Sequence, residues 1–158
     1  MQEKKIKKAV IIPTYNERQN IEVIIPIIFN LLPDVQIFVV DDNSPDGTGI
    51  FVAFLQKKFS NLHLIKRQKK EGLGKAYIHA FRHIMGAGGA QTIVMMDADM
   101  SHDPKYLPKI FEMSLENDVV VGSRYIKGGQ TEGWESWRKI LSYGGNFYCK
   151  LCIVLSFF

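Results

Sequence analysis

Residues 35–48 read VQIFVVDDNSPDGT and combine a structural signal with a chemical one. Val35–Val40 is a short, β-branched and almost continuously apolar run, which is typical of a strand buried on both faces of a parallel sheet. Polar residues from Asp41 to Gly47 follow it at once. Ligands of open α/β sheets bind outside the carboxyl ends of the strands, so this junction predicts a strand that leads into a binding site.

The same alternation of apolar runs and helical patterns extends along the chain. Further strand-like runs are Lys8–Ile12, Thr92–Met96 and Val119–Val121. The helical patterns are Glu17–Leu32, Pro45–Phe59, Leu73–Met85 and Pro104–Leu115, with Asn16 and Ser44 placed as N-caps. Pro26 predicts a kink or a late start in the first helix. Alternating strands and helices predict an α/β fold with a doubly wound, mostly parallel sheet.

Length and composition describe an ordinary globular domain. The chain has 158 residues, of which 46% are hydrophobic and 23% charged, so disordered and low-complexity classes are excluded. One domain, residues 1–158, is the expectation. The net charge of +4 favours anionic partners. Ile153–Phe158 is apolar and has no polar tail, which predicts a domain that is incomplete at its C-terminal end.

A second acidic motif, Asp97-Ala98-Asp99, follows another strand-like run. On an extended backbone the alternate carboxylates share one side, where hard oxygen ligands hold Mg²⁺ or Mn²⁺. Two aspartates alone are a weak signal, but the other strand ends add more polar groups. These are Asp41, Asp42, Tyr15 and Glu17, together with Arg124 and Arg138. As a set they suit a nucleoside diphosphate, whose phosphates need a metal and cations.

Six blocks of sequence carry a family resemblance. They are Ile11–Glu17, Val39–Thr48, Gly72–Tyr77, Met96–His102, Gly122–Tyr125 and Trp137–Ser142. In order and spacing they resemble the family 2 glycosyltransferases of GT-A fold, a Rossmann-like nucleotide-sugar-binding fold, and within them the dolichyl-phosphate (polyprenyl-phosphate) mannosyltransferases. The resemblance covers most of the chain, from near residue 9 to near residue 146.

The resemblance implies a role for individual residues. Those lining the guanosine pocket would be Pro13, Tyr15, Glu17, Val40 and Asp42, and those under the ribose and diphosphate would be Asp97, Ala98 and Asp99. Asp99 would be the main ligand of Mg²⁺ or Mn²⁺, with Ser101 as a neutral second ligand. Arg124, Arg138 and Ser142 would contact the acceptor phosphate and the leaving diphosphate. Asp99, Arg124 and Arg138 would be the catalytic residues.

The implied activity is transfer of mannose from GDP-mannose to dolichyl or polyprenyl phosphate, giving a β-linked product by inverting displacement. The acceptor phosphate is already ionised at neutral pH, its second pKa being about 6, so no catalytic base is required. Two alternatives stay open: a glucosyl or other hexosyl transferase to polyprenyl phosphate, and a truncated nucleotide-sugar-binding module without turnover.

The expected location is the cytosolic face of a membrane, which would be the endoplasmic reticulum in a eukaryote or the plasma membrane in a prokaryote. The amino terminus lacks the apolar segment of a signal peptide, and no apolar stretch reaches the roughly 18 to 20 residues of a membrane span. Peripheral attachment is therefore expected, with a membrane-anchoring partner subunit compatible with it. Trp134 and Trp137 suit a bilayer interface equally as well as a helix packed on the core.

Three other functional classes are excluded because this chain lacks residues that they require. Gly72-Leu73-Gly74-Lys75-Ala76 lacks the first glycine and the Ser/Thr of a phosphate loop. A receiver domain needs its acidic pair after the first strand, where this chain has Pro13-Thr14-Tyr15. The basic clusters Lys4–Lys8 and Lys66–Lys70 have no interleaved aromatics, which predicts a solvated or membrane-facing surface and no nucleic-acid partner.

Overall fold

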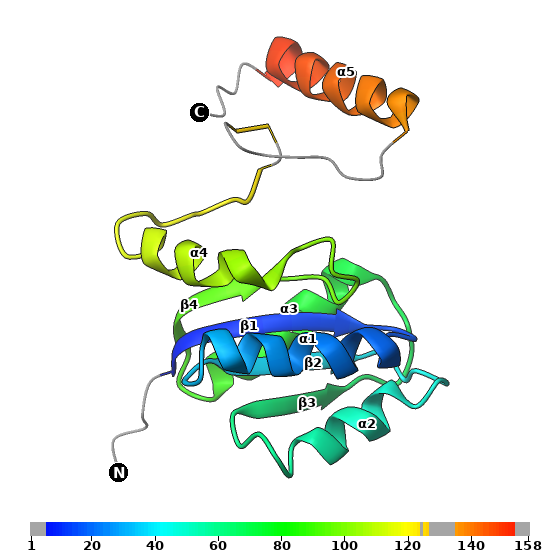
Figure 1. Cartoon of the computed structure of the whole chain (residues 1–158), viewed down its shortest axis with the longest axis vertical. Coiled ribbons are helices and arrows are strands. Elements are labelled where there is room, and N and C mark those ends of the chain that lie inside the picture. Colours follow the sequence, from blue (N-terminus) through cyan, green and yellow to red (C-terminus); the bar gives the residue numbers. More distant parts are fainter. Residues whose placement is uncertain (1–5, 124, 127–134, 154–158) are drawn as a thin grey trace. The chain divides into compact units, whose positions relative to one another are not determined.

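The computed structural model describes residues 6–123, 125–126 and 135–153 (Figure 1). The chain divides into two compact units, Met1–Val120 and Val121–Phe158. The first unit alternates strands and helices in the order β1 (Ile6–Thr14), α1 (Arg18–Leu31), β2 (Gln36–Asp41), α2 (Thr48–Leu55), β3 (Leu62–Lys66), α3 (Leu73–Gly86), β4 (Ala90–Met95), a 3-10 turn (Pro104–Tyr106) and α4 (Leu107–Met113). The second unit contains α5 (Ser136–Ile153).

The four strands form one parallel sheet in the order β3-β2-β1-β4. Alternate residues of each central strand enter separate cores, as the two-residue period of a strand requires. Val10 of β1 belongs to a core shared with α1, α2 and α4, whereas its neighbour Ile11 belongs to a core shared with α3. Helices thus cover both faces, and the predicted doubly wound parallel fold is confirmed.

Burial explains why the strands read as continuous apolar runs. Val39 and Val40 of β2 are both fully buried, one in each core, so neither face of this strand tolerates a polar residue. Helix α1 supplies the largest helical share of the first core through Ile21, Ile24, Ile25 and Ile28. This spacing is the apolar stripe of a helix that packs on a sheet.

Several predicted boundaries are wrong. Val119–Val121 is not a strand in the structure. Leu62–Lys66, which was not among the predicted runs, is strand β3. The helix predicted over Pro45–Phe59 is confined to α2, because the residues before Thr48 form the loop that leaves β2. Helix α1 begins at Arg18 and runs through Pro26, so it does not start late.

The predicted N-caps are also wrong, and the reason lies in the loops. Asn16 has a φ of 61°, and Glu17 occupies the N-cap position of α1. Gly47, not Ser44, precedes α2 as its N-cap. Ser44 and Asp46 of this loop, and Thr48 at the start of α2, instead accept hydrogen bonds from the backbone amides of residues 16–18. Among the described residues, no helix is both long and apolar enough to cross a membrane.

Candidate functional site

The carboxyl ends of β2, β1 and β4 lie next to one another, because β1 is the strand between the other two. Thr14 at the end of β1 is in register with Asp41 at the end of β2. Beyond these strand ends the backbone turns sharply, and Asn16, Asn43 and Met100 have φ values of 61°, 58° and 62°. Among the described residues these are the non-glycine positions with positive φ, a conformation that is found disproportionately at functional sites.

Asp41 is built into the end of the sheet. Its carboxylate is buried and accepts hydrogen bonds from Thr14 Oγ1 at 3.1 Å, from Ser44 N at 3.1 Å and from Ser44 Oγ at 2.5 Å. A buried carboxylate needs such donors to offset its desolvation. Gly49 is required beside it, because a Cβ there would lie 2.8 Å from Asp41 Oδ2. Asp41 therefore closes the loop rather than facing a ligand.

Asp42 has a charged partner that the sequence did not reveal. Arg67, which follows β3, donates from Nη1 to Asp42 Oδ1 at 2.7 Å, and both residues are less than 10% exposed. The other guanidinium nitrogen donates to Glu71 Oε2 at 3.2 Å. Arg67 lies within the basic cluster that was predicted to be a solvated surface, and for this residue the prediction is wrong. Arg67 thus holds Asp42 in place through one of its two carboxylate oxygens, Oδ1.

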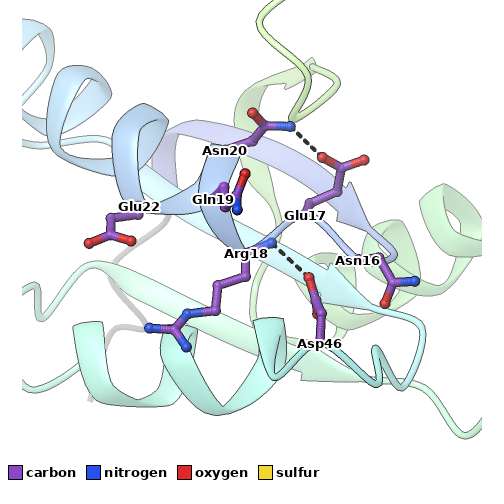
Figure 2. A pocket seen from close by; sticks show the side chains of 7 residues that line it. All are labelled: Asn16, Glu17, Arg18, Gln19, Asn20, Glu22 and Asp46. Carbon is purple, nitrogen blue, oxygen red and sulfur yellow. Dashed lines mark hydrogen bonds between the residues drawn. The ribbon is translucent and has the colours of Figure 1, made fainter.

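The turn between β1 and α1 contributes an aromatic ring and a carboxylate. Tyr15 is 37% exposed, and Lys70 Nζ lies 4.2 Å from the centre of its ring. Glu17 Oε2 accepts a hydrogen bond from Asn20 Nδ2 at 2.6 Å. Figure 2 shows Glu17 and Asn20 joined in this way, beside the bond from the Arg18 amide to Asp46.

A polar hollow surrounds this turn, and Figure 2 shows its lining side chains distributed around the first turns of α1. They are Asn16, Glu17, Arg18, Gln19, Asn20, Glu22 and Asp46. Among the predicted site residues that the structure describes, only Glu17 lines it. The hollow therefore marks the surface near the predicted nucleotide pocket and not its centre.

Asp97 and Asp99 lie beyond the end of β4 in a different environment. Ala98 between them is buried in the core shared with α1, whereas Asp99 is exposed. Tyr77 Oη lies 3.4 Å from Asp97 Oδ1, and the Asp97 amide donates to His102 Nδ1 at 3.0 Å. Burial, and then the Asp97 charge, raise the pKa of Tyr77. The segment is not extended, since residues 98–102 form bends.

Asp99 keeps its charge in this bend. Its Oδ1 accepts a hydrogen bond from Ser101 N at 3.0 Å. Hydrogen bonds from Ser101, followed by the nearby His102, hold the pKa of Asp99 below its ordinary value. An exposed, ionised carboxylate beside the Ser101 hydroxyl is a hard oxygen donor set.

These oxygens fit a divalent cation that takes its remaining ligands from a substrate. Within the described ranges, no three His, Cys, Asp or Glu side chains come together in a cluster able to hold a metal. Mg²⁺, however, is usually bound through one or two carboxylates, several waters and substrate phosphates. Asp99 and Ser101 match that mode of binding, whereas a closed all-protein metal site does not.

The structure describes some of the remaining predicted residues and not others. Pro13 is half-buried near the end of β1, and Val40 is fully buried beside it in β2. Arg124 lies outside the described residues. Arg138 and Ser142 belong to α5 in the second unit, where Ser142 Oγ is hydrogen-bonded to Tyr125 Oη. Trp137 is exposed on the same helix, and Trp134 lies outside the described residues.

A doubly wound parallel domain whose strand ends present acidic and aromatic side chains is of the nucleotide-binding α/β class. The family described as Glycosyl transferase family 2 matches residues 9–154, and the chain belongs to this family. The resemblance inferred from the six sequence blocks is thereby confirmed.

Curated relatives match most of this chain. It is 38% identical over 146 residues to an undecaprenyl-phosphate mannosyltransferase of Micrococcus luteus, covering 92% of this chain and 60% of the relative. It is 42% identical to a dolichol-phosphate mannosyltransferase of Pyrococcus furiosus, covering 88% and 39% respectively. A polyprenol monophosphomannose synthase of Mycolicibacterium smegmatis is 39% identical, with 93% and 56% covered. The chain thus spans between about two fifths and three fifths of the length of these relatives.

Solved structures share the fold of part of this chain. The mannosyltransferase PcManGT from Pyrobaculum calidifontis, solved in complex with GDP-Man and Mn²⁺, matches with a TM-score of 0.51 at 29% identity, over 60% of this chain and 28% of that one. TarS 1–349 of S. aureus, in complex with UDP, matches with a TM-score of 0.52 at 26% identity, over the same shares. Both neighbours are nucleotide complexes.

Proposed function

We propose that this chain carries the donor-binding region of a polyprenyl-phosphate mannosyltransferase. The proposed reaction moves mannose from GDP-mannose to dolichyl or polyprenyl phosphate with inversion, giving a β-linked lipid-phosphate mannose. The observation that supports it most is the exposed, ionised Asp99 beyond β4, in a chain at least 38% identical to relatives named as such mannosyltransferases.

In this proposal the nucleoside lies at the ends of β1 and β2. The ring of Tyr15 is available for stacking once Lys70 moves aside, and Asp42 retains Oδ2 as an acceptor because Arg67 binds only its Oδ1. Glu17 adds a second carboxylate for ribose or base hydrogens. Pro13 and Val40 shape the floor of the pocket through the backbone, since the Val40 side chain is buried.

The diphosphate lies against Asp97, Ala98 and Asp99, and Asp99 with Ser101 would hold Mg²⁺ or Mn²⁺. A bound cation supplies compensation for the negative charge that develops on the departing diphosphate. The chain's own task is to keep Asp99 ionised and correctly oriented, which the amide of Ser101 does at 3.0 Å. The Tyr77 hydroxyl orients the Asp97 carboxylate, and His102 Nδ1 accepts a hydrogen bond from the Asp97 backbone amide.

The acceptor side of the proposal involves Arg124, Arg138 and Ser142. Guanidinium groups suit phosphate oxygens because they donate from two nitrogens in one plane. A phosphate acceptor is ionised at neutral pH, so its oxygen attacks the anomeric carbon without a base. Exposed apolar side chains on α5, among them Trp137, Ile140 and Leu141, are consistent with work at the cytosolic membrane surface.

A second candidate differs only in the donor. The UDP complex of TarS matches this fold as well as the GDP-Man complex of PcManGT does. A UDP-hexose donor would use the same strand ends, with Asp42 facing a smaller base. A nucleotide-binding module without turnover would bind the donor and transfer nothing.

Calorimetric titration of the purified chain with GDP, GDP-mannose and UDP-glucose separates these functions. Each ligand is titrated with Mn²⁺ and again with EDTA. Binding of GDP and GDP-mannose that requires Mn²⁺, with no binding of UDP-glucose, is the expected result, and mannose transfer to polyprenyl phosphate in vesicles is the next assay. Preference for UDP-glucose would favour the second candidate. A folded chain that binds none of the three contradicts the proposed donor site.

A further inference from the structure

Three backbone amides of the turn that carries Tyr15 and Glu17 are anchored by the loop after β2 and the first residue of α2. Three successive amides, those of Asn16, Glu17 and Arg18, precede or begin helix α1 and therefore have no acceptor within that helix. They donate to Ser44 Oγ at 3.0 Å, Thr48 Oγ1 at 3.1 Å and Asp46 Oδ2 at 3.1 Å.

The three accepting side chains are themselves fixed. Thr48 is fully buried, and its hydroxyl donates to Asp46 Oδ1 at 2.6 Å while it accepts from the Glu17 amide. The Ser44 hydroxyl donates to Asp41 Oδ1, which also accepts from Thr14. The ends of β1 and β2 are thereby joined by one hydrogen-bonded network. Within it, Thr48 is the side chain that is most enclosed.

We infer that Thr48 is a positioning residue for the donor nucleotide, acting through the backbone amide of Glu17. The inference rests on the proposed function, in which Tyr15 and Glu17 contact the nucleoside. Asn16 adopts the left-handed region at φ 61°, a conformation that is disfavoured for a residue with a Cβ and has to be held in place. Without the Thr48 anchor the turn occupies other conformations, and only the fraction with the correct turn binds the ligand.

Thr48→Val tests this inference, because it keeps the shape of the side chain and removes the hydroxyl that joins Glu17 to Asp46. We expect affinity for GDP in the presence of Mn²⁺ to fall about tenfold, as it would if the correct turn were populated in roughly one molecule in ten. The Glu17 amide should also exchange its hydrogen faster, as measured by NMR. Thr48→Ser restores the hydroxyl and should restore both values.

The matched control is Thr92→Val in β4. Thr92 also hydrogen-bonds through its hydroxyl, to Ser114 Oγ at 3.2 Å, but it is in register with Lys8, six residues before the end of β1. This variant should lose stability without losing GDP affinity. If Thr48→Val binds GDP as wild type does, or if Thr92→Val weakens GDP equally, Thr48 has only a structural role. A wild-type chain that binds no GDP contradicts the proposed function itself, and the positioning role then falls with it.

Discussion

The carboxyl ends of β2 and β4 each present two aspartates, but their surroundings are opposite. Asp41 and Asp42 after β2 are both buried, and the protein supplies their hydrogen-bond donors and their counter-charge. Asp99 after β4 is exposed, and its Oδ1 accepts a hydrogen bond from the amide of Ser101. Asp97 is half-buried, and the Tyr77 hydroxyl lies 3.4 Å from its Oδ1.

The difference shows that a place at the end of a strand does not by itself make an acidic residue a ligand. A carboxylate whose oxygens are filled by protein donors stabilises the loop that it closes. A carboxylate that stays ionised and exposed keeps lone pairs that can bind a ligand. On this reasoning Asp41 closes the loop and Asp42 is held in place through its Oδ1, whereas the exposed Asp99 fits the metal-binding role proposed for it.

Removing Arg67 should produce the largest effect on stability. Arg67→Met leaves the buried charge of Asp42 without its partner, and breaking such a pair costs about 3–5 kcal/mol. Urea unfolding followed by circular dichroism measures this loss. Lys66→Met, at the exposed neighbouring position, is the matched control and should change the free energy of unfolding by less than about 0.5 kcal/mol.

A double variant sharpens the same test. Combining Asp42→Asn with Arg67→Met removes the charge that the single variant leaves unpaired, so it should be more stable than Arg67→Met alone. Equal stability of the two would mean that Asp42 does not depend on Arg67, and the distinction between the two strand ends would lose its main support.

Asp99→Ala tests the other side of the comparison. It removes the exposed carboxylate, so affinity for GDP in Mn²⁺ should fall by about a hundredfold, while the unfolding free energy changes little. Calorimetry with Mn²⁺ and with EDTA measures the effect. Asp103→Ala removes an acid four residues further on, which caps the 3-10 turn, and it should leave the metal dependence intact. Unchanged GDP affinity in Asp99→Ala would contradict its role as metal ligand.

The sequence predicted the central part of the fold because burial on two faces leaves an unmistakable apolar run. This holds for the buried parts of β1 and β2; β4 was predicted from its apolar composition although of its residues only Val94 is buried, and the predicted start of α3 at Leu73 agrees with the structure. Val119–Val121 has the same composition but does not form a strand, because a strand also needs a ladder partner that composition does not reveal. Leu62–Lys66 escaped prediction because His63 and Lys66 interrupt its apolar character.

Only the parts of the site that consist of residues close together in the sequence could be predicted. Asp97, Asp99 and Asp42 were identified as polar residues after apolar runs, and their location at strand ends is confirmed. Arg67 was missed because its partner Asp42 is 25 residues away and joins it only through the pairing of β2 with β3. The hydrogen bonds from the amides at the start of α1 to side chains after β2 were hidden for the same reason.

Substitution of two helical glycines by alanine tests how tightly the end of β2 is packed. Gly49→Ala in α2 places a Cβ 2.8 Å from Asp41 Oδ2, so overpacking should destabilise the protein by about 1–3 kcal/mol. Gly74→Ala in α3 meets nothing within 4 Å and should stabilise it by about 0.5–1 kcal/mol through helix propensity. Thermal unfolding of both variants provides the measurement. If both substitutions stabilise, Asp41 is free to move and the network around it is looser than described.

Substitution of Asp46 should have the smallest effect on the free energy of unfolding, and this effect should depend on pH. Burial works to raise the pKa of Asp46, but hydrogen bonds from Thr48 and Arg18 outweigh it and hold the pKa below the ordinary value. A carboxyl with a lowered folded-state pKa stabilises the protein above its unfolded pKa of about 3.9, and this contribution is lost as the pH falls through the folded value.

Asp46→Asn should therefore be less stable than wild type at pH 6 by about 0.5 kcal/mol, because Asn still accepts hydrogen bonds and solvent screens the charge of an exposed carboxylate. Below pH 4 the wild-type carboxyl also takes up a proton, and the two unfolding free energies should converge. Urea unfolding at pH 3, 4, 5 and 6 measures the difference. Asp103→Asn is a useful second probe, because hydrogen bonds from Lys105 also lower the pKa of Asp103, but at the 3-10 turn after β4. A difference for Asp46→Asn that stays constant down to pH 3 would mean that the charge of Asp46 does not hold the start of α1, and that neutral hydrogen bonds alone join the two loops.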